Sequence, residues 1–347
     1  MTLSVAASTP EGSARAEEAG NAAATTTAAP PAVSVIIATY NAAAYISEAL
    51  DSVLAQTFKS YEIIVVNDGS PDTLELERAL EPYRGRIVYI KQENRGVSGA
   101  RNTGIRAARA TLIAHLDPDD LWEPEYLAVQ VAAMRNDPTI DVLYPNALIF
   151  GDMPEAGKEF MEICPSHGEV TFESLVTQQC NVMTSITARR EMVLRAGMFD
   201  ESLRCSEDFD LWLRIVKEGG RIGYHRRILV RYRRWRGSLS SDPVRVCENA
   251  LRVLDKVERT LALTANERQV LKRARARFHA MLRFNEGKRA FTRGDTEAAI
   301  AGLKEANAFF LSRKTALVLL LMRLVPGLLL RAYHLRDQYI WRTDTRV

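Results

Sequence analysis

The stretch from residue 111 to residue 120 constrains the fold of this chain more than any other, because an apolar run there ends abruptly in carboxylates. Its first half is typical of a short buried strand, and Asp117, Asp119 and Asp120 follow directly. Carboxylates this close repel one another, so they are stable together only when they are solvated or when a hard cation such as Mg2+ or Mn2+ neutralises them. Asp119 or Asp120 could also cap a helix that begins soon afterwards. The stretch therefore predicts a cation site, a helix cap, or both, at the end of a strand.

Strand patterns alternate with helical patterns over the first half of the chain. Runs beginning at Val33 and Tyr61 are rich in β-branched residues, as strands buried on both faces are. The alternation predicts βαβ units and an α/β fold of Rossmann-like type, with a mostly parallel sheet flanked by helices. The expected strands are 33–38, 61–66, 86–90, 111–116 and 140–144, and the expected helices are 45–54, 74–80, 97–109 and 122–135.

Polar turns follow three of these expected strands. Thr39, Tyr40 and Asn41 follow the first strand, Asp68 follows the second, and residues 117–120 follow the fourth. Ligands of parallel α/β sheets bind beyond the carboxyl ends of the strands, so these turns are expected to converge on one ligand site.

Charge and cysteine content exclude several classes of protein. Residues 245–347 hold 21 Lys and Arg against 10 Asp and Glu, whereas residues 1–244 hold 25 against 33. A basic tail suits an anionic membrane surface or acidic neighbours, and no recognition module for nucleic acid accompanies it. Four cysteines without C-x-x-C spacing argue against zinc and against a disulfide framework, which fits a reducing cytoplasm.

The two ends of the chain differ from its centre. Residues 1–31 are rich in Ala, Thr, Ser, Gly and Glu without an apolar period, which predicts a disordered leader and not a signal peptide. Residues 246–347 show only helical patterns, including a hairpin at 286–306 that resembles one tetratricopeptide repeat. Residues 316–330 are apolar with basic flanks, which suits either an interfacial membrane anchor or a core helix of the tail.

Several motifs occur in a fixed order and carry a resemblance to a known family. They are residues 33–41, 52–57, 63–70, 94–104 and 117–120. This order resembles the family 2 glycosyltransferases, and the likeness extends to about Ser241. It implies a GT-A glycosyltransferase domain at 32–245, followed by an α-helical C-terminal region. A nucleotidyltransferase would instead carry a Gly-rich phosphate loop after the first strand, where this chain has Ala38 and the Thr-Tyr-Asn turn.

The resemblance also implies roles in binding a nucleotide sugar. The turn of Thr39, Tyr40 and Asn41 would pack on the base, and Asp68 would accept a hydrogen bond from the uracil N–H. The alternative for Asp68 is a turn residue that bonds its own backbone. Arg101 would lie near the base or the diphosphate.

By the same resemblance, the carboxylate turn holds ribose and metal. Asp117 and Asp119 would contact the nucleotide sugar, and Asp119 and Asp120 would bind Mg2+ or Mn2+. A divalent cation on the diphosphate stabilises the charge that grows as the glycosidic bond breaks.

The expected acceptor half begins after residues 151–185, a span without periodicity that suits a functional loop. Residues 206–214 restore the family resemblance and imply that Asp208 is the general base, with Glu207 as the alternative. A base lowers the barrier because an acceptor hydroxyl is a poor nucleophile. The other interpretation is that these carboxylates only favour the N-terminal end of a helix.

The arginine-rich run at 231–240 resembles the corresponding segment of non-processive family members, and its Arg-x-x-Arg-Trp spacing is also similar to an acceptor motif of processive polysaccharide synthases. The function expected is that of an inverting glycosyltransferase. It would transfer a sugar from a UDP-sugar to a hydroxyl of a glycan or lipid-linked acceptor in cell-surface polysaccharide or glycolipid synthesis. A processive synthase and a catalytically inactive sugar-nucleotide sensor are the alternatives. The expected location is the cytoplasm, with a peripheral contact at the inner face of the plasma membrane.

Overall fold

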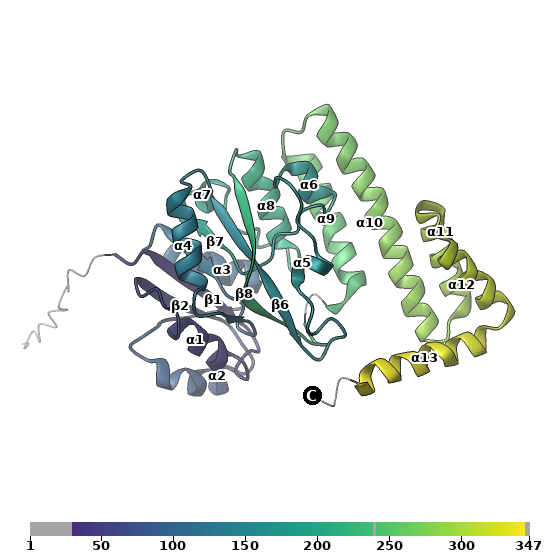
Figure 1. Cartoon of the computed structure of the whole chain (residues 1–347), viewed down its shortest axis with the longest axis horizontal. Coiled ribbons are helices and arrows are strands. Elements are labelled where there is room, and N and C mark those ends of the chain that lie inside the picture. Colours follow the sequence, from purple (N-terminus) through teal and green to yellow (C-terminus); the bar gives the residue numbers. More distant parts are fainter. Residues whose placement is uncertain (1–29, 239–240, 344–347) are drawn as a thin grey trace, which may run out of the picture. The chain divides into compact units, whose positions relative to one another are not determined.

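The computed structural model describes residues 30–238 and 241–343 (Figure 1). The predicted disordered leader, residues 1–31, lies outside the described residues except for its last two positions. The domain limits at 245 and 246 stay predictions.

Within the described residues, eight strands form one sheet in the order β3-β2-β1-β4-β7-β6-β8-β5. β1 pairs in parallel with β2 and β4, and β2 pairs in parallel with β3. β7 lies antiparallel between β4 and β6, β8 is parallel to β6, and β5 closes the order as an antiparallel partner of β8. The strands are β1 (Val33–Thr39), β2 (Tyr61–Asp68), β3 (Val88–Gln92), β4 (Leu112–His115), β5 (Leu121–Trp122), β6 (Val142–Gly151), β7 (Thr187–Arg189) and β8 (Ile222–Arg234).

Helices flank this sheet and form the whole described tail (Figure 1). The predicted α/β class with a helical C-terminal region is therefore confirmed. The helices are α1 (Ile46–Leu54), α2 (Thr73–Leu80), α3 (Gly96–Ala107), α4 (Tyr126–Asn136), α5 (Phe160–Ile163), α6 (Phe172–Val176), α7 (Arg190–Arg195), α8 (Glu207–Lys217), α9 (Pro243–Thr260), α10 (Ala265–Thr292), α11 (Thr296–Phe310), α12 (Arg313–Leu324) and α13 (Pro326–Thr343).

The main hydrophobic core joins the sheet to the first two tail helices. β-branched side chains of β1 and β2 are fully buried, as the sequence pattern predicts for central parallel strands. The same core includes Val253 and Leu254 of α9 and Leu271 and Phe278 of α10. These two helices thus belong to the packing that supports the sheet.

The hairpin predicted at 286–306 is formed by the end of α10 and by α11. The two helices approach closely at Gly302, where an added Cβ would lie 2.8 Å from the carbonyl oxygen of Arg283. A glycine is required there because any side chain would push the helices apart. A second, smaller core of Phe291, Leu303 and Met322 lies between α10, α11 and α12. Among the described residues, no helix combines the length and the apolar character that crossing a bilayer would require.

The structure corrects three local expectations. The apolar helical pattern from Leu211 predicts that Glu207 and Asp208 precede a helix, but they lie inside the first turn of α8. The arginine-rich run is expected to follow a strand, but its residues 231–234 are the end of β8. The span 151–185 contains the short helices α5 and α6, which are too short to show a period in the sequence.

Candidate functional site

The turns after β1 and β2 lie side by side because these strands pair in parallel up to Thr39 and Asn67. Thr39 is buried, and its Oγ1 donates to the carbonyl oxygen of Val66 at 3.0 Å. Asn41 adopts a left-handed conformation with φ of 53°, and its N–H donates to Ser70 Oγ at 2.6 Å. Tyr40 between them is 54% exposed. The turn therefore holds its backbone in the fold and presents one aromatic ring to solvent.

Asp68 is the last residue of β2, and only one of its two carboxylate oxygens accepts hydrogen bonds from described residues. Its Oδ1 accepts from Gln92 Nε2 at 2.7 Å and from the N–H of Arg95 at 2.8 Å. Its Oδ2 is buried and has no hydrogen-bond partner in the described part of the chain. A buried oxygen without a partner is costly, so a ligand donor would be favourable at this position.

Arg101 of α3 joins the carboxylate turn to the start of α8. Its guanidinium donates to Glu207 Oε1 at 2.6 Å and to Asp117 Oδ1 at 2.8 Å. The arginine is 4% exposed and lies 5.3 Å from the ring centre of Phe199. Burial is the largest influence on the pKa of Asp117 and would raise it, but the charge and hydrogen bond of Arg101, together with smaller contributions, lower it overall. Asp117 and Glu207 thus share one buried cation.

Asp119 and Asp120 are tied to the end of β8. The N–H of Arg233 donates to Asp120 Oδ1 at 2.8 Å, and its Nε donates to the carbonyl oxygen of Asp119 at 2.8 Å. Trp235 Nε1 donates to Asp119 Oδ2 at 3.1 Å. Asp120 is fully buried, and its Oδ2 has no hydrogen-bond partner within residues 30–238 and 241–343.

The electrostatics of these two aspartates suit a cation. Burial first, and then the charge of Asp117, raise the pKa of Asp119. Burial first, and then the charges of Asp119 and Asp117, raise the pKa of Asp120 well above its usual range. A divalent cation would relieve this repulsion, and Mg2+ is often held by one or two carboxylates together with substrate phosphates. The described residues contain no cluster of three or more His, Cys, Asp or Glu arranged as a complete metal site.

Two residues at this site were not predicted. Arg233 lies over the rings of Tyr45 and Phe150, at 5.0 and 4.4 Å, and pairs with Glu48 at 2.8 Å. His115 of β4 is buried against Phe199, and burial first, then the charge of Arg101, lower its pKa to about 3. The arginine-rich run gave a signal for Arg233, whereas an isolated histidine in an apolar strand gave none.

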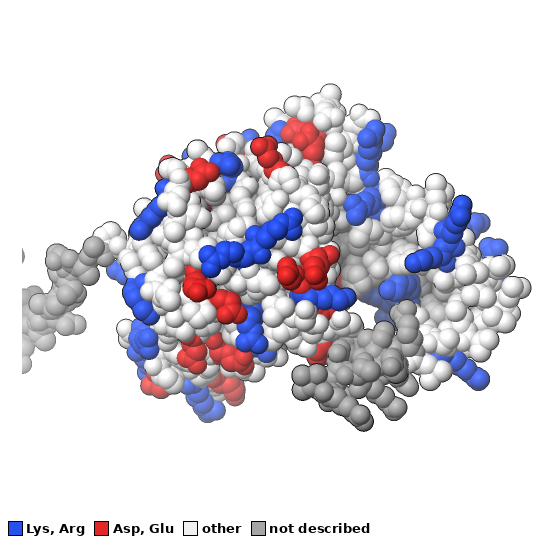
Figure 2. Space-filling view, in the orientation of Figure 1, with Lys and Arg blue, Asp and Glu red and all other residues white. Residues whose placement is uncertain are grey.

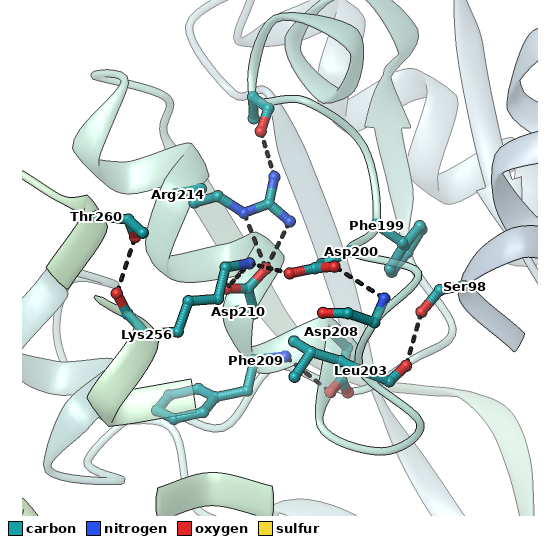
Figure 3. A network of polar contacts seen from close by, with 12 residues as sticks. Ser98, Phe199, Asp200, Leu203, Asp208, Phe209, Asp210, Arg214, Lys256 and Thr260 are labelled. Carbon is teal, nitrogen blue, oxygen red and sulfur yellow. Dashed lines mark hydrogen bonds and ion pairs between the residues drawn. The ribbon is translucent and has the colours of Figure 1, made fainter. Parts of the chain in front are cut away.

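The first turn of α8 carries three carboxylates in three different environments, and Figure 3 shows two of them, Asp208 and Asp210. Glu207 is paired with Arg101. Asp210 is fully buried and pairs with Arg214 and Lys256, each at 2.7 Å. Asp208 Oδ1 accepts from the N–H of Phe209 at 2.7 Å, and no described cation pairs with this carboxylate. Burial first, and then the charge of Glu207, raise the pKa of Asp208 to about 7. Asp208 can therefore exchange a proton near neutral pH.

Lys256 of the tail helix α9 completes this network. Its Nζ lies 2.6 Å from Asp200 Oδ2 and 2.7 Å from Asp210 Oδ1 (Figure 3). Burial is the largest influence on the pKa of Asp200 and would raise it, but the hydrogen bonds from Lys256 and Ser202 and the charge of Lys256 together lower it to about 2. Asp210 is therefore part of the ion-pair framework that fixes α8.

Solved structures with this fold define its class. A mannosyltransferase of Pyrobaculum calidifontis in complex with GDP-Man and Mn2+ has a TM-score of 0.59 at 21% identity, over 90% of this chain and 85% of that one. TarS 1–349 of Staphylococcus aureus in complex with UDP has a TM-score of 0.57 at 21% identity, over 84% and 86%. The fold is that of the GT-A glycosyltransferases.

Sequence comparison gives the family. The model described as "Glycosyl transferase family 2" matches residues 34–193. An uncharacterised glycosyltransferase of Methanocaldococcus jannaschii is 30% identical over 209 residues, which are 58% of this chain and 70% of that protein. The chain belongs to glycosyl transferase family 2, as its motif order predicted. It spans only part of several other relatives: 58% of one from Rickettsia typhi (33% identical, 53% of this chain) and 29% of one from Rickettsia bellii (32% identical, 58% of this chain).

Proposed function

We propose that this chain is an inverting, metal-dependent glycosyltransferase that uses a nucleotide sugar, with UDP as the nucleotide, and a hydroxyl acceptor. The observation that carries the proposal is the contrast on α8. Asp208 has a pKa of about 7 and no described cation beside it, whereas its neighbours Glu207 and Asp210 are held in buried ion pairs. This is the arrangement required of a general base that must bind and release a proton during turnover.

The proposed reaction is a single displacement. The Asp208 carboxylate takes the proton of the acceptor hydroxyl while the hydroxyl oxygen forms a bond to the anomeric carbon of the donor. The bond from that carbon to the diphosphate breaks on the opposite face, and its electron pair leaves with the nucleoside diphosphate. Attack and departure on opposite faces invert the configuration at the anomeric carbon. Glu207 is the weaker candidate for the base, because proton uptake there would break its ion pair with Arg101.

The proposed donor site is the edge where the three turns meet. The free Oδ2 of Asp68 suits a base N–H, and the exposed ring of Tyr40, set by Thr39 and Asn41, suits the flat face of the base. Asp117 and Asp119 would contact the sugar nucleotide, and Arg101 would act beside them by fixing the position of Asp117.

Asp119 and Asp120 would hold Mg2+ or Mn2+. When bound, the ion would stabilise the charge that develops on the diphosphate. The free Oδ2 of Asp120 and the raised pKa of both carboxyl groups support this assignment.

We further propose a peripheral contact of the tail with the inner face of the plasma membrane. α12 and α13 expose large apolar side chains, including Leu317 (56%), Leu324 (67%) and Leu328 (68%). In Figure 2 the surface over α11 and α12 carries Lys and Arg but little Asp or Glu. Exposed leucines beside basic side chains match an interfacial helix on anionic lipid, and a lipid-linked acceptor in cell-surface glycan synthesis would be reached from there.

The test of the proposed activity is nucleotide release from UDP-, GDP- and TDP-sugars, with and without Mn2+ or Mg2+. Release from one donor that requires the metal, and that both Asp120→Ala and Asp208→Asn reduce at least about a hundredfold, is the expected result. Donor binding without release, unaffected by Asp208→Asn, would favour a sensor. Absence of donor binding by calorimetry would refute the use of a nucleotide sugar.

A further inference from the structure

A cavity of about 210 Å³ lies against the proposed general base. Asp208 is part of its wall, together with Phe209 and Trp212 from the same helix, α8. A second wall comes from the 160–182 segment. The third comes from the tail, through α9 and α10. The cavity therefore depends on the helical region that follows the family-matched part of the chain, residues 34–193.

The tail wall and the α8 wall are almost entirely apolar. Val246 and Ala250 line the cavity from α9, and Phe278 lines it from α10. Phe209 and Trp212 add aromatic surface beside Asp208. The indole Nε1 of Trp212 is buried and has no hydrogen-bond partner in the described part of the chain. Polar side chains also line the cavity, namely Gln178 and Asn181 from the 160–182 segment and Ser206 just before α8, whereas the tail contributes only apolar side chains.

Such a lining discriminates between ligands. A sugar ring placed against the tail wall would turn hydroxyl groups toward Val246, Ala250 and Phe278, where they would find no hydrogen bonds, and each unpaired hydroxyl in an apolar site is costly. An apolar group pays no such penalty and gains from leaving water. A cavity of about 150 Å³ with apolar walls is known to hold benzene, so this one has room for a ring or for a branched five-carbon chain.

We propose that this cavity receives an apolar group of the acceptor, attached close to the hydroxyl that reacts at Asp208. The inference rests on the proposed function, because it takes Asp208 as the base. It adds that the acceptor is amphipathic at the reacting end, and that α9 and α10 select it. An acceptor of this kind fills the cavity and displaces water from Asp208, whereas a water molecule alone cannot, so transfer is favoured over hydrolysis of the donor.

The probes are small alcohols, since they carry the two features that the site is proposed to recognise and require no knowledge of the sugar. Benzyl alcohol offers a ring, 3-methylbut-2-en-1-ol offers a branched chain, and glycerol is the polar control. Binding to the full chain in the presence of UDP is measured by saturation-transfer NMR, which does not require turnover. Tighter binding of benzyl alcohol would indicate a ring as the apolar group of the acceptor, and tighter binding of 3-methylbut-2-en-1-ol would indicate a branched hydrocarbon chain.

Three variants locate the binding. Ala250→Phe fills the cavity from α9, Phe278→Ala enlarges it from α10, and Ala276→Phe adds the same ring on the exposed side of α10 as a matched control. The Kd of the better apolar alcohol is expected to rise at least about tenfold in Ala250→Phe and to stay unchanged in Ala276→Phe. If Ala250→Phe does not fold, as judged by thermal unfolding, Phe278→Ala decides, and the larger probe 2-naphthylmethanol is expected to bind it more tightly than the original chain.

Two results would overturn the proposal. One is binding of glycerol as tight as that of both apolar alcohols. The other is an unchanged Kd for every probe in Ala250→Phe and Phe278→Ala. Failure of the proposed function gives a separate signal, because UDP-sugar binding and nucleotide release are measured without any alcohol. A chain that releases nucleotide but shows no apolar selectivity refutes the acceptor pocket alone.

Discussion

The environment of Asp208 predicts that replacing it with asparagine abolishes transfer and yet stabilises the fold at alkaline pH. The pKa of this carboxyl is raised from 3.8 to about 7, chiefly by burial and then by the charge of Glu207. A carboxyl whose pKa is raised on folding contributes stability that is present below the unfolded pKa and is lost as the pH rises through the folded pKa. The cost of ionising Asp208 in the folded chain therefore builds up between about pH 4 and pH 7 and stays at its full size above pH 7.

The size of the effect follows from the shift. A change of about three pKa units corresponds to about 4 kcal/mol, which is an upper limit because the carboxyl borders a cavity and water partly screens it. Asp208→Asn removes the ionisation, so its gain in unfolding free energy over the original chain should be larger at pH 8.5 than at pH 5, by up to about 2.7 kcal/mol, because part of the cost is already present at pH 5.

Urea denaturation at both pH values measures this difference, and Asp152→Asn, at an exposed loop position, is the matched control. In the original chain, nucleotide release is expected to rise with pH through about 7 and then level off, since the base must be ionised. An Asn variant that gains no stability at pH 8.5 would show that ionisation of Asp208 does not destabilise the fold. An Asn variant that keeps the pH profile of the original chain would show that Asp208 is not the base.

Three further results are expected. Arg101→Met should lower the unfolding free energy by about 3–5 kcal/mol in urea, because it leaves buried carboxylates without their cation, and adding Glu207→Gln should recover part of that loss. Asp120→Asn should not change the Kd of UDP measured in the absence of metal, but it should raise the calorimetric Kd of Mn2+ at least about tenfold. An unchanged Kd of Mn2+ would place the metal elsewhere. Leu320→Glu with Leu328→Glu should abolish co-sedimentation with phosphatidylglycerol vesicles, and binding that survives both changes would exclude the tail as the anchor.

The sheet was largely predictable because its central strands are long, β-branched and buried on both faces, and these properties are local in the sequence. β1 and β2 were found for this reason. The two-residue strand β5 was not, because two residues show no period, and its existence depends on pairing with β8, more than a hundred positions away. The unexpected length of β6 has the same origin, since its second half is paired with the end of β8.

The candidate site could be proposed from the sequence, but its internal contacts could not. The motif order singled out Asp68, Asp117 and Asp208 as candidates, because each lies near the end or the start of an element with a clear pattern, and their roles stay predictions. It could not show that Arg101 bridges Asp117 to Glu207, since an ion pair between distant positions leaves no mark on spacing. The fully buried state of Asp120, and its bond to the backbone of β8, are likewise products of the tertiary fold.

The ion pairs that Lys256 makes limit the positions at which this chain can be recombined with its relatives. Lys256 of α9 pairs with Asp210 of α8, whose carboxylate is fully buried. A chimera joined at residue 245 would keep Arg214 but remove Lys256, so the buried Asp210 would lose one of its two described cations and Asp200 would lose its partner. An exchange of tails, in the laboratory or in evolution, that keeps α9 preserves these pairs, which makes the helix part of one inherited unit with the sheet.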